Sequence, residues 1–437
     1  MGQSLNFLKN HLFIGRKAKS KTCCLLALDI GTEFVKAVIF KVGKTSSDDG
    51  ESKEQAVIIG VGRQRQMANQ MRAGAVADIE GVALTCQKVI NQAAQMARSK
   101  PTRVVIGIAG EFIKGATTNF VYKRSNSEQR IGLAELKNII QKIQWKAFNK
   151  IRSQIAWETG RPEVEIRLIN ALIPEIRIDG YQVANPLGFP GQEVFLSIFN
   201  VYAPLIHLSA LENIVAKLDL ELLSIVAEPY ALTKSSSLNP MAGAILIDIG
   251  GGTTDIALVR QGKIEGIKSF SLAGQAFTKR LCQSLDLDLP EAEDIKIRHS
   301  HRQLSQNVQR KIREILKNDV RIWLNGVELI LEEFDQKEFF PSTILLCGGG
   351  SILPDIKNIL SRETVQREWM EKLPFSRAPE VKFIRSSQID NVIDQANVLK
   401  GPENIVPLAL SGLALEILTD EVRILPSVLR RVARIMR

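Results

Sequence analysis

The sequence has few cysteines and no long apolar run. Its five cysteines, in 437 residues, form no Cys-x-x-Cys pair and have no Cys/His spacing typical of a zinc site. No apolar run approaches the roughly 20 residues of a membrane-spanning helix, and the N-terminus lacks the apolar stretch and cleavage site of a signal peptide. We therefore expect reduced thiols in a cytosolic protein with two or more globular domains.

Acidic residues are missing from both ends of the chain. Residues 1–21 contain five lysines and arginines, and the last eight residues contain four arginines, so the two ends hold nine of the ten excess positive charges. The body is nearly neutral. This distribution argues against a nucleic-acid-binding body and favours attachment through the termini.

A strand-turn-strand pattern occurs twice. Residues Leu28–Lys44 (LDIGTEFVKAVIFKVGK) align without a gap to Ile247–Lys263 (IDIGGGTTDIALVRQGK). In each copy an apolar strand leads to an Asp and a glycine turn, whose N–H groups and carboxylate can hold a phosphate chain and its cation. The repeat predicts two duplicated α/β domains that face one cleft.

A third glycine turn, Gly348-Gly349-Gly350-Ser351, follows a strand and precedes a helix. Glycines at such a turn let the backbone approach a purine or a phosphate closely. Taken alone, this turn has an equally good explanation in packing, and the second repeat could be a capped glycine-rich hairpin. The three turns together favour a nucleotide site.

In this order the three turns resemble the phosphate-1, phosphate-2 and adenosine motifs of the superfamily that contains actin, sugar kinases and heat-shock chaperone ATPases. Four further stretches are most similar to the bacterial cell-division family FtsA. They are Asp179–Gly191 with its Asn-Pro-Leu-Gly-Phe turn, Ala227–Ala231, Ala292–Lys296 and Val406–Ala414. The resemblance covers about residues 22–418. It implies an α/β, two-lobed actin-like ATPase fold with an inserted FtsA-type (SHS2-like) subdomain.

The resemblance also implies the domain organisation. The expected parts are a basic N-terminal arm (1–22), a first actin-like domain (23–101 and 203–238), the inserted subdomain (102–202), a second actin-like domain (239–418) with a reduced upper lobe at about 297–340, and a C-terminal amphipathic membrane-targeting helix (419–437).

A site for ATP and Mg2+ follows from the same resemblance. Asp29 and Asp248 would hold the cation through water. Glu228 would orient a water molecule for an ATPase that is at most slow, although it could equally be an acid that stabilises a helix N-terminus. The implied nucleotide contacts are Asp29, Gly31, Thr32, Asp248, Gly250, Gly251, Gly252 and Thr253 for phosphate and cation, Glu293 and Lys296 for ribose, and Gly348, Gly349, Gly350 and Ser351 for adenosine.

The last residues predict an interfacial helix. An apolar stripe faces an arginine face that contains no acid, which is typical of a helix lying on anionic lipid. A terminal helix docked on the body or on a partner protein is the alternative, but such a helix normally carries some acids. The residues expected at the membrane are Leu425, Val428, Leu429, Arg430, Arg431, Val432, Arg434, Ile435, Met436 and Arg437.

The resemblance implies a scaffold on the cytoplasmic side of the inner membrane, at the division site. Such proteins self-associate into actin-like filaments, tether FtsZ and recruit other division proteins. The segment between Lys296 and Thr343 lacks the β-hairpin that belongs to the FtsZ-binding lobe, which puts FtsZ in doubt, and Gln366–Lys400 is an added segment without an assigned role. The alternatives are a PilM-like pilus assembly platform and a sugar-kinase-like phosphotransferase, although the latter lacks a convincing substrate cluster.

Overall fold

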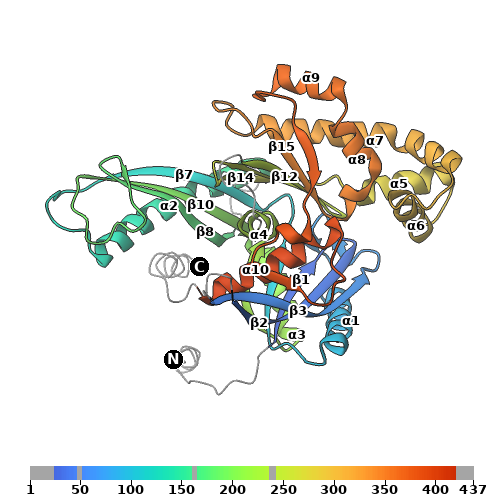
Figure 1. Cartoon of the computed structure of the whole chain (residues 1–437), viewed down its shortest axis with the longest axis horizontal. Coiled ribbons are helices and arrows are strands. Elements are labelled where there is room, and N and C mark those ends of the chain that lie inside the picture. The colour runs from blue at the N-terminus through green and yellow to red at the C-terminus, as the bar shows by residue number, and fades with distance from the viewer. Residues whose placement is uncertain (1–23, 47–51, 160–164, 236–242, 420–437) are drawn as a thin grey trace.

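The computed structural model describes residues 24–46, 52–159, 165–235 and 243–419. In Figure 1, one lobe contains the blue strands, a second contains the yellow and orange elements, and a cyan and green insert projects to one side. The predicted basic arm and the predicted membrane helix lie outside the described residues.

The first lobe contains a mixed sheet of six strands. In sheet order these are β11 (Glu221–Ala227), β6 (Arg103–Ile108), β1 (Leu25–Ile30), β2 (Phe34–Ser46), β3 (Ser52–Arg65) and β17 (Val392–Asp394). β1 is antiparallel to β2 and parallel to β6. Every residue of β1 is buried, as its continuous apolar run predicts for a strand covered on both faces.

The second lobe repeats this arrangement. Its strands, in sheet order, are β16 (Glu380–Phe383), β15 (Thr343–Cys347), β12 (Ala244–Ile249), β13 (Thr254–Arg260) and β14 (Lys263–Phe270). β12 is antiparallel to β13 and parallel to β15, just as β1 is to β2 and β6. The duplication of α/β lobes that the sequence repeat predicts is confirmed.

Two large apolar cores lie between the sheets and the helices. One fills the first lobe and continues onto the second-lobe strands through Leu246, Ala257 and Leu345, and the other fills the rest of the second lobe. Helices cover the sheets. They are α1 (Ile79–Ala97), α3 (Leu205–Lys217), α4 (Glu228–Ser235) and α10 (Ile405–Thr419) in the first lobe, and α5 (Gly274–Leu285), α6 (Leu289–Ser300), α7 (Gln306–Glu332), α8 (Pro354–Leu360) and α9 (Glu363–Lys372) in the second. α1 and α6 begin at Asp78 and Asp288, whose carboxylates accept hydrogen bonds from first-turn N–H groups. Short elements are β4 (Met71–Arg72), β5 (Ala75–Val76) and the 3-10 helices η1 (Gly349–Ile352), η2 (Ser386–Gln388) and η3 (Pro402–Asn404).

The insert extends the sheet of the second lobe. It consists of β7 (Lys114–Lys123), β10 (Glu193–Pro204), β8 (Ile166–Ile178) and β9 (Tyr181–Gln182), with α2 (Leu133–Thr159) packed on one face. β7 pairs antiparallel with β14 through Ala116 and Gly115. The second lobe and the insert therefore share one sheet of nine strands, although the chain enters and leaves the insert from the first lobe.

Two features of the insert differ from the sequence prediction. No strand was expected at Lys114–Lys123, because its polar, partly exposed residues (GATTNFVYK) give only a weak strand pattern. β6 lies between β11 and β1 in the first sheet, so the insert begins after Ile108 and not at residue 102. The other predicted domain boundaries stay predictions.

Two unusual segments of the second lobe have clear structures. Between β14 and β15 every residue is described, and the segment contains α5, α6 and α7 but no strand, which agrees with the expected loss of a β-hairpin. The added segment 366–400 returns to the first lobe. There β17 pairs with β3 through Val392–Asp394 and forms the edge strand of the six-stranded sheet.

Candidate functional site

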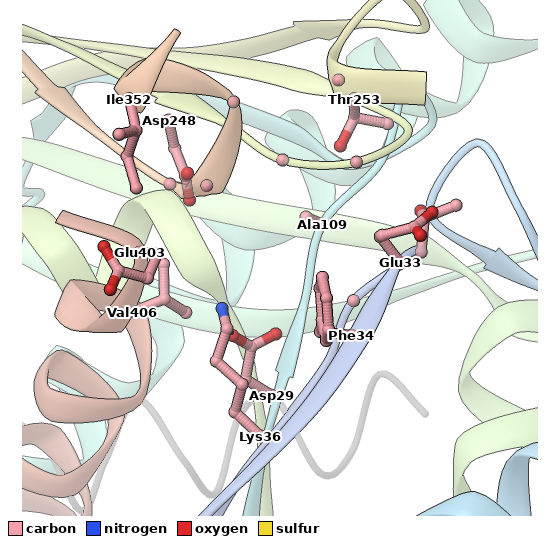
Figure 2. Close-up of a pocket in the computed structure, with 18 of the residues that line it drawn as sticks. Asp29, Glu33, Phe34, Lys36, Ala109, Asp248, Thr253, Ile352, Glu403 and Val406 are labelled. Carbon is pink, nitrogen blue, oxygen red and sulfur yellow. The ribbon is translucent and has the colours of Figure 1, made fainter. Parts of the chain in front are cut away.

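A cavity of about 410 Å³ lies between the two lobes. The two repeated hairpins line it from opposite sides, and the third glycine turn lines one end (Figure 2). Of the residues predicted from the sequence, the cavity is lined by Asp29, Gly31, Thr32, Glu228, Asp248, Gly250, Gly251, Thr253, Glu293, Lys296, Gly348, Gly349 and Gly350.

The two hairpins have the same register. Asp29 lies opposite Lys36 in the first hairpin, and Asp248 lies opposite Asp255 in the second. Lys36 Nζ is 2.9 Å from Asp29 Oδ2 and lies on the cavity wall. Sequence reasoning aligned Lys36 with Asp255 but did not assign it to the site; the repeat contained the signal, because both positions directly face the first Asp of their turn.

Carboxylates outnumber cations in this part of the cleft. Asp248, Asp255 and Glu228 are buried near the single ion pair of Asp29 and Lys36. Burial, followed by the charge of Asp255, raises the pKa of Asp248 to about 7, although Lys36 opposes the rise. Burial and then Asp29 raise the pKa of Glu228 well above its usual range.

The pKa of Lys36 is shifted by burial and by the same carboxylates. Burial alone would lower the pKa of Lys36, but the neighbouring carboxylates, Asp29 first, raise it above its ordinary value. The ligand-free cleft thus concentrates negative charge at low dielectric, and a bound cation would relieve this repulsion.

The glycine turns of the two lobes touch each other. A Cβ atom on Gly251 would lie 2.8 Å from Glu33 Cβ, and one on Gly252 would lie 2.6 Å from Thr32 Oγ1. In the repeat Thr32 corresponds to Gly251 and Glu33 to Gly252, so the two contacts are related by a pseudo-two-fold rotation that exchanges the lobes. Gly252 packs on Thr32 and is not among the residues that line the cavity, so its contact with phosphate stays a prediction.

The third glycine turn packs directly against the second turn, beside Asp248. Gly348 has φ +83°, and a Cβ atom there would lie 2.2 Å from Asp248 Oδ1, so glycine is required for both conformation and space. Ser351 is buried, and its hydroxyl donates a hydrogen bond to the Gly348 carbonyl at 2.7 Å. Ser351 therefore closes the turn and does not line the cavity as predicted. Ile352, Glu403 and Val406, which the sequence did not reveal, form the wall beside it.

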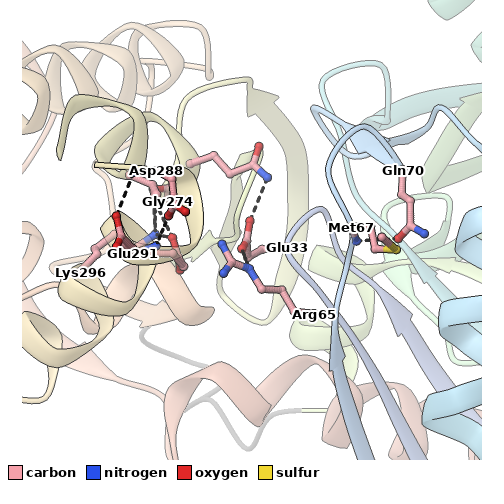
Figure 3. A network of polar contacts seen from close by, with 11 residues as sticks. Glu33, Arg65, Met67, Gln70, Gly274, Asp288, Glu291 and Lys296 are labelled. Carbon is pink, nitrogen blue, oxygen red and sulfur yellow. Dashed lines mark hydrogen bonds and ion pairs between the residues drawn. The ribbon is translucent and has the colours of Figure 1, made fainter. Parts of the chain in front are cut away.

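Glu293 and Lys296 reach the cavity from successive turns of α6, as their spacing requires. Lys296 Nζ is 2.6 Å from Glu293 Oε2 and donates to Thr278 Oγ1 and the Gly274 carbonyl (Figure 3). These three acceptors use all the donors of the ammonium group. A ribose contact through Lys296 would replace one of these bonds, whereas Glu293 Oε1 has no hydrogen-bond partner among the described residues.

The residues present fit a water-mediated divalent cation. In the described part of the chain, no three His, Cys, Asp or Glu side chains are close enough to hold a metal directly. Asp29 and Asp248 occupy equivalent positions in the two turns and both line the cavity. Mg2+ usually keeps several waters and takes few protein carboxylates, so this pair suits it better than a closed ligand cage would.

Comparison with known proteins identifies the relatives. Residues 245–400 match the family described as "Cell division protein FtsA". The chain is 26% identical to the cell division protein FtsA of Pseudomonas aeruginosa over 279 residues, which cover 63% of this chain and 61% of that protein. It is 28% identical over 275 residues to FtsA of Neisseria meningitidis serogroup B, covering 62% and 60%. The resemblance to FtsA is confirmed, and the chain spans less than two thirds of these relatives' length.

Among solved structures, the chain resembles one described as "PilM-PilN type IV pilus biogenesis complex". The TM-score is 0.56 at 17% sequence identity, and the match covers 89% of this chain and 97% of that chain. At this identity the similarity concerns the fold. The predicted actin-like ATPase fold is thereby confirmed.

Asp248→Asn should stabilise the ligand-free protein at alkaline pH. The pKa of Asp248 in the folded protein is about 7 against an ordinary 3.8, so the folded state loses stability as pH rises from about 4 to about 7. A pKa difference of about three corresponds to at most about 4 kcal/mol. Thermal unfolding should show a clearly higher midpoint for the variant at pH 8 and only about a quarter of this gain at pH 4.5. Asp294→Asn, at an exposed position of α6, is the control; a gain independent of pH would contradict the prediction.

Proposed function

We propose, from the premise that this chain is a divergent FtsA-like protein, that it is an ATP-binding actin-like scaffold of cell division. The observation that carries the proposal is the cavity between two hairpins of identical register, with glycine turns and paired carboxylates on both sides. Such a cleft offers backbone N–H groups to phosphates and carboxylates to a cation.

In this proposal the nucleotide runs along the cavity from the third turn to the first. Adenosine lies at Gly348–Gly350, Glu293 is near the ribose, and the phosphates lie between the turns at Gly31–Thr32 and Gly250–Gly251. Asp29 and Asp248 hold Mg2+ through water, and the cation would neutralise phosphate charge. Lys36, on the cavity wall, adds a second positive charge.

The proposed ATPase activity is slow at most. In this proposal Glu228, which begins α4 on the cavity wall, is the acid that orients a water molecule. Burial and the neighbouring carboxylates, Asp29 first, raise the pKa of Glu228 well above its usual range, which favours the protonated form of the ligand-free carboxyl. Nucleotide binding would therefore control assembly into filaments more than it would drive turnover.

Membrane attachment rests on the C-terminal sequence. Leu425 begins a stripe of apolar residues, and Arg430, Arg431, Arg434 and Arg437 occupy the opposite face, which favours the surface of anionic lipid. Within the described ranges, no helix is long and apolar enough to cross a bilayer. The proposed location is peripheral, on the cytoplasmic face of the inner membrane at the division site, where the scaffold would self-associate and recruit other division proteins.

Of the proposed partners, FtsZ has the least support from the structure. The segment between Lys296 and Thr343 is helical, and the β-hairpin expected in the FtsZ-binding lobe is missing from it. A pilus assembly platform is the competing function, favoured by the similarity in fold to the chain of the PilM-PilN complex.

Asp248→Ala should abolish binding of Mg-ATP. The variant removes the carboxylate that holds the cation from the second lobe, and we expect affinity to fall by about 100-fold or more, or roughly 3 kcal/mol. Isothermal titration calorimetry at pH 7.5 measures the loss. Asp294→Ala, one residue beyond Glu293 but exposed, should bind like the unaltered chain. Undiminished affinity in Asp248→Ala would refute the assignment of the cleft.

Deletion of residues 425–437 should release the protein from anionic liposomes. Co-sedimentation with vesicles rich in phosphatidylglycerol tests this expectation, and neutral vesicles provide the reference. Replacing Arg430, Arg431, Arg434 and Arg437 with Gln keeps the apolar stripe and should weaken binding by about 1 kcal/mol per residue. If the truncated chain pellets like the full chain, the anchor lies elsewhere.

A peptide with the C-terminal sequence of FtsZ should be captured by the full chain if this protein tethers FtsZ. Immobilised peptide, with a scrambled peptide as control, gives a direct readout in a pull-down or by surface plasmon resonance. Capture supports the division tether. Failure to bind, under conditions where nucleotide binding is intact, would favour the pilus-type platform.

A further inference from the structure

Glu33 is a carboxylate in a turn where the other copy of the repeat has glycine. Its counterpart is Gly252, and Thr32 replaces Gly251 in the same way. The Glu33 side chain is only 15% exposed and lines the cavity. A buried acid in a turn expected to hold phosphate calls for a physical explanation, because like charges at low dielectric repel each other.

Two hydrogen bonds fix the Glu33 carboxylate across the cleft. Arg65 Nε lies 2.6 Å from Oε1, within the first lobe, and Gln275 Nε2 donates to Oε2 at 3.0 Å from α5 of the second lobe. Figure 3 shows Glu33 between these two elements. The side chain therefore links the lobes at a point where their turns already touch through Gly251.

Glu33 lies at the far end of the cavity from the third glycine turn. In Figure 2, Ile352, Glu403 and Val406 stand on one side, while Glu33, Phe34 and Thr253 stand on the other, with Asp29 and Lys36 between them. A nucleotide with adenosine at the third turn extends its phosphates toward Glu33. The last phosphate of the chain is then the one that meets this carboxylate.

Of the two arginines near Glu33, one is ion-paired and the other stacks on an aromatic ring at the cavity wall. Arg65 is paired with Glu33 itself, and the Arg63 guanidinium stacks 3.9 Å from the centroid of the Phe34 ring. A third phosphate would add negative charge beside Glu33 and would compete with it for Arg65. A diphosphate ends earlier and leaves both hydrogen bonds of Glu33 intact.

We propose that Glu33 determines how many phosphates the cleft accepts, and that it favours a nucleoside diphosphate over the triphosphate. The inference rests on the proposed function, because it takes nucleotide binding in this cleft as given. It assigns to Glu33 a specificity role that Gly252, its counterpart, cannot have. It also makes the bond between Glu33 and Gln275 a contact that the triphosphate must displace.

The test compares affinities for Mg-ADP and Mg-ATP by calorimetry on the full chain, at one ionic strength. The unaltered protein should bind Mg-ADP more tightly, by about tenfold, which corresponds to about 1.4 kcal/mol. Glu33→Gln keeps the size and the acceptor oxygen but removes the charge and frees Arg65, so the preference should shift toward Mg-ATP by about tenfold or more.

Two further variants separate charge from structure. Glu33→Asp retains the charge and should retain the preference for diphosphate. Gln275→Ala removes the bond between the lobes without removing the charge, so it should relieve only the cost of displacing this bond and should shift the affinity ratio toward Mg-ATP by less than Glu33→Gln does. Thermal unfolding midpoints confirm that each variant is folded.

The possible outcomes are distinguishable. If both nucleotides bind and Glu33→Gln leaves their affinity ratio unchanged, the role of Glu33 is refuted while the nucleotide site stands. If the unaltered chain prefers the triphosphate, the inference is likewise refuted. If neither nucleotide binds, the proposed function fails, and the specificity role fails with it.

Discussion

The contact between the two glycine turns determines the spacing of the lobes and hence the cleft. Gly251 and Gly252 lack the Cβ atoms that would collide with Glu33 and Thr32, so the second turn can pack directly on the first. The two copies of the repeat are unequal for this reason: side chains in one copy fill the space that glycines leave in the other. Two identical bulky turns would clash at the pseudo-two-fold axis, and two glycine turns would leave a gap where the lobes now meet.

The buried charges of the two hairpins also differ between the two copies of the repeat. At equivalent positions, one hairpin pairs Asp29 with Lys36 and the other sets Asp248 against Asp255. The first pair is compensated. The second is not, and its cost appears in the raised pKa of Asp248. A protein selected for stability alone would not retain this arrangement, which fits a site whose charge is balanced by a ligand.

The sequence was sufficient for the parts of the fold with strong patterns. Continuous apolar runs before Asp29 and Asp248 mark buried central strands, and the gapless repeat predicts their shared geometry. β7 was not predicted because its residues are polar and partly exposed. β17 was not predicted because a strand of three residues is too short to show a sequence pattern. Glu33 and Glu403 could not be assigned to the site, since their positions depend on a close approach between lobes that no local sequence encodes. Lys36 could have been assigned, because the repeat places it opposite Asp29. Gly252 and Ser351 contact Thr32 and Gly348 and do not line the cavity. A glycine-rich turn indicates closeness but not which partner is close.

The insert is covalently joined to one lobe and hydrogen-bonded to the other. Its chain connections lead to β6 and α3, whereas β7 pairs with β14 at Ala116 and Gly115, and Lys263 of β14 forms an ion pair with Glu175 of β8. The Gly110 N–H, at the junction with β6, lies 3.5 Å from the Asp255 carboxylate in the cleft. Because the insert shares a sheet with the second lobe, a rotation of that lobe relative to the first would carry the insert with it, and the connection to β6 would bend beside Asp255 in the cleft.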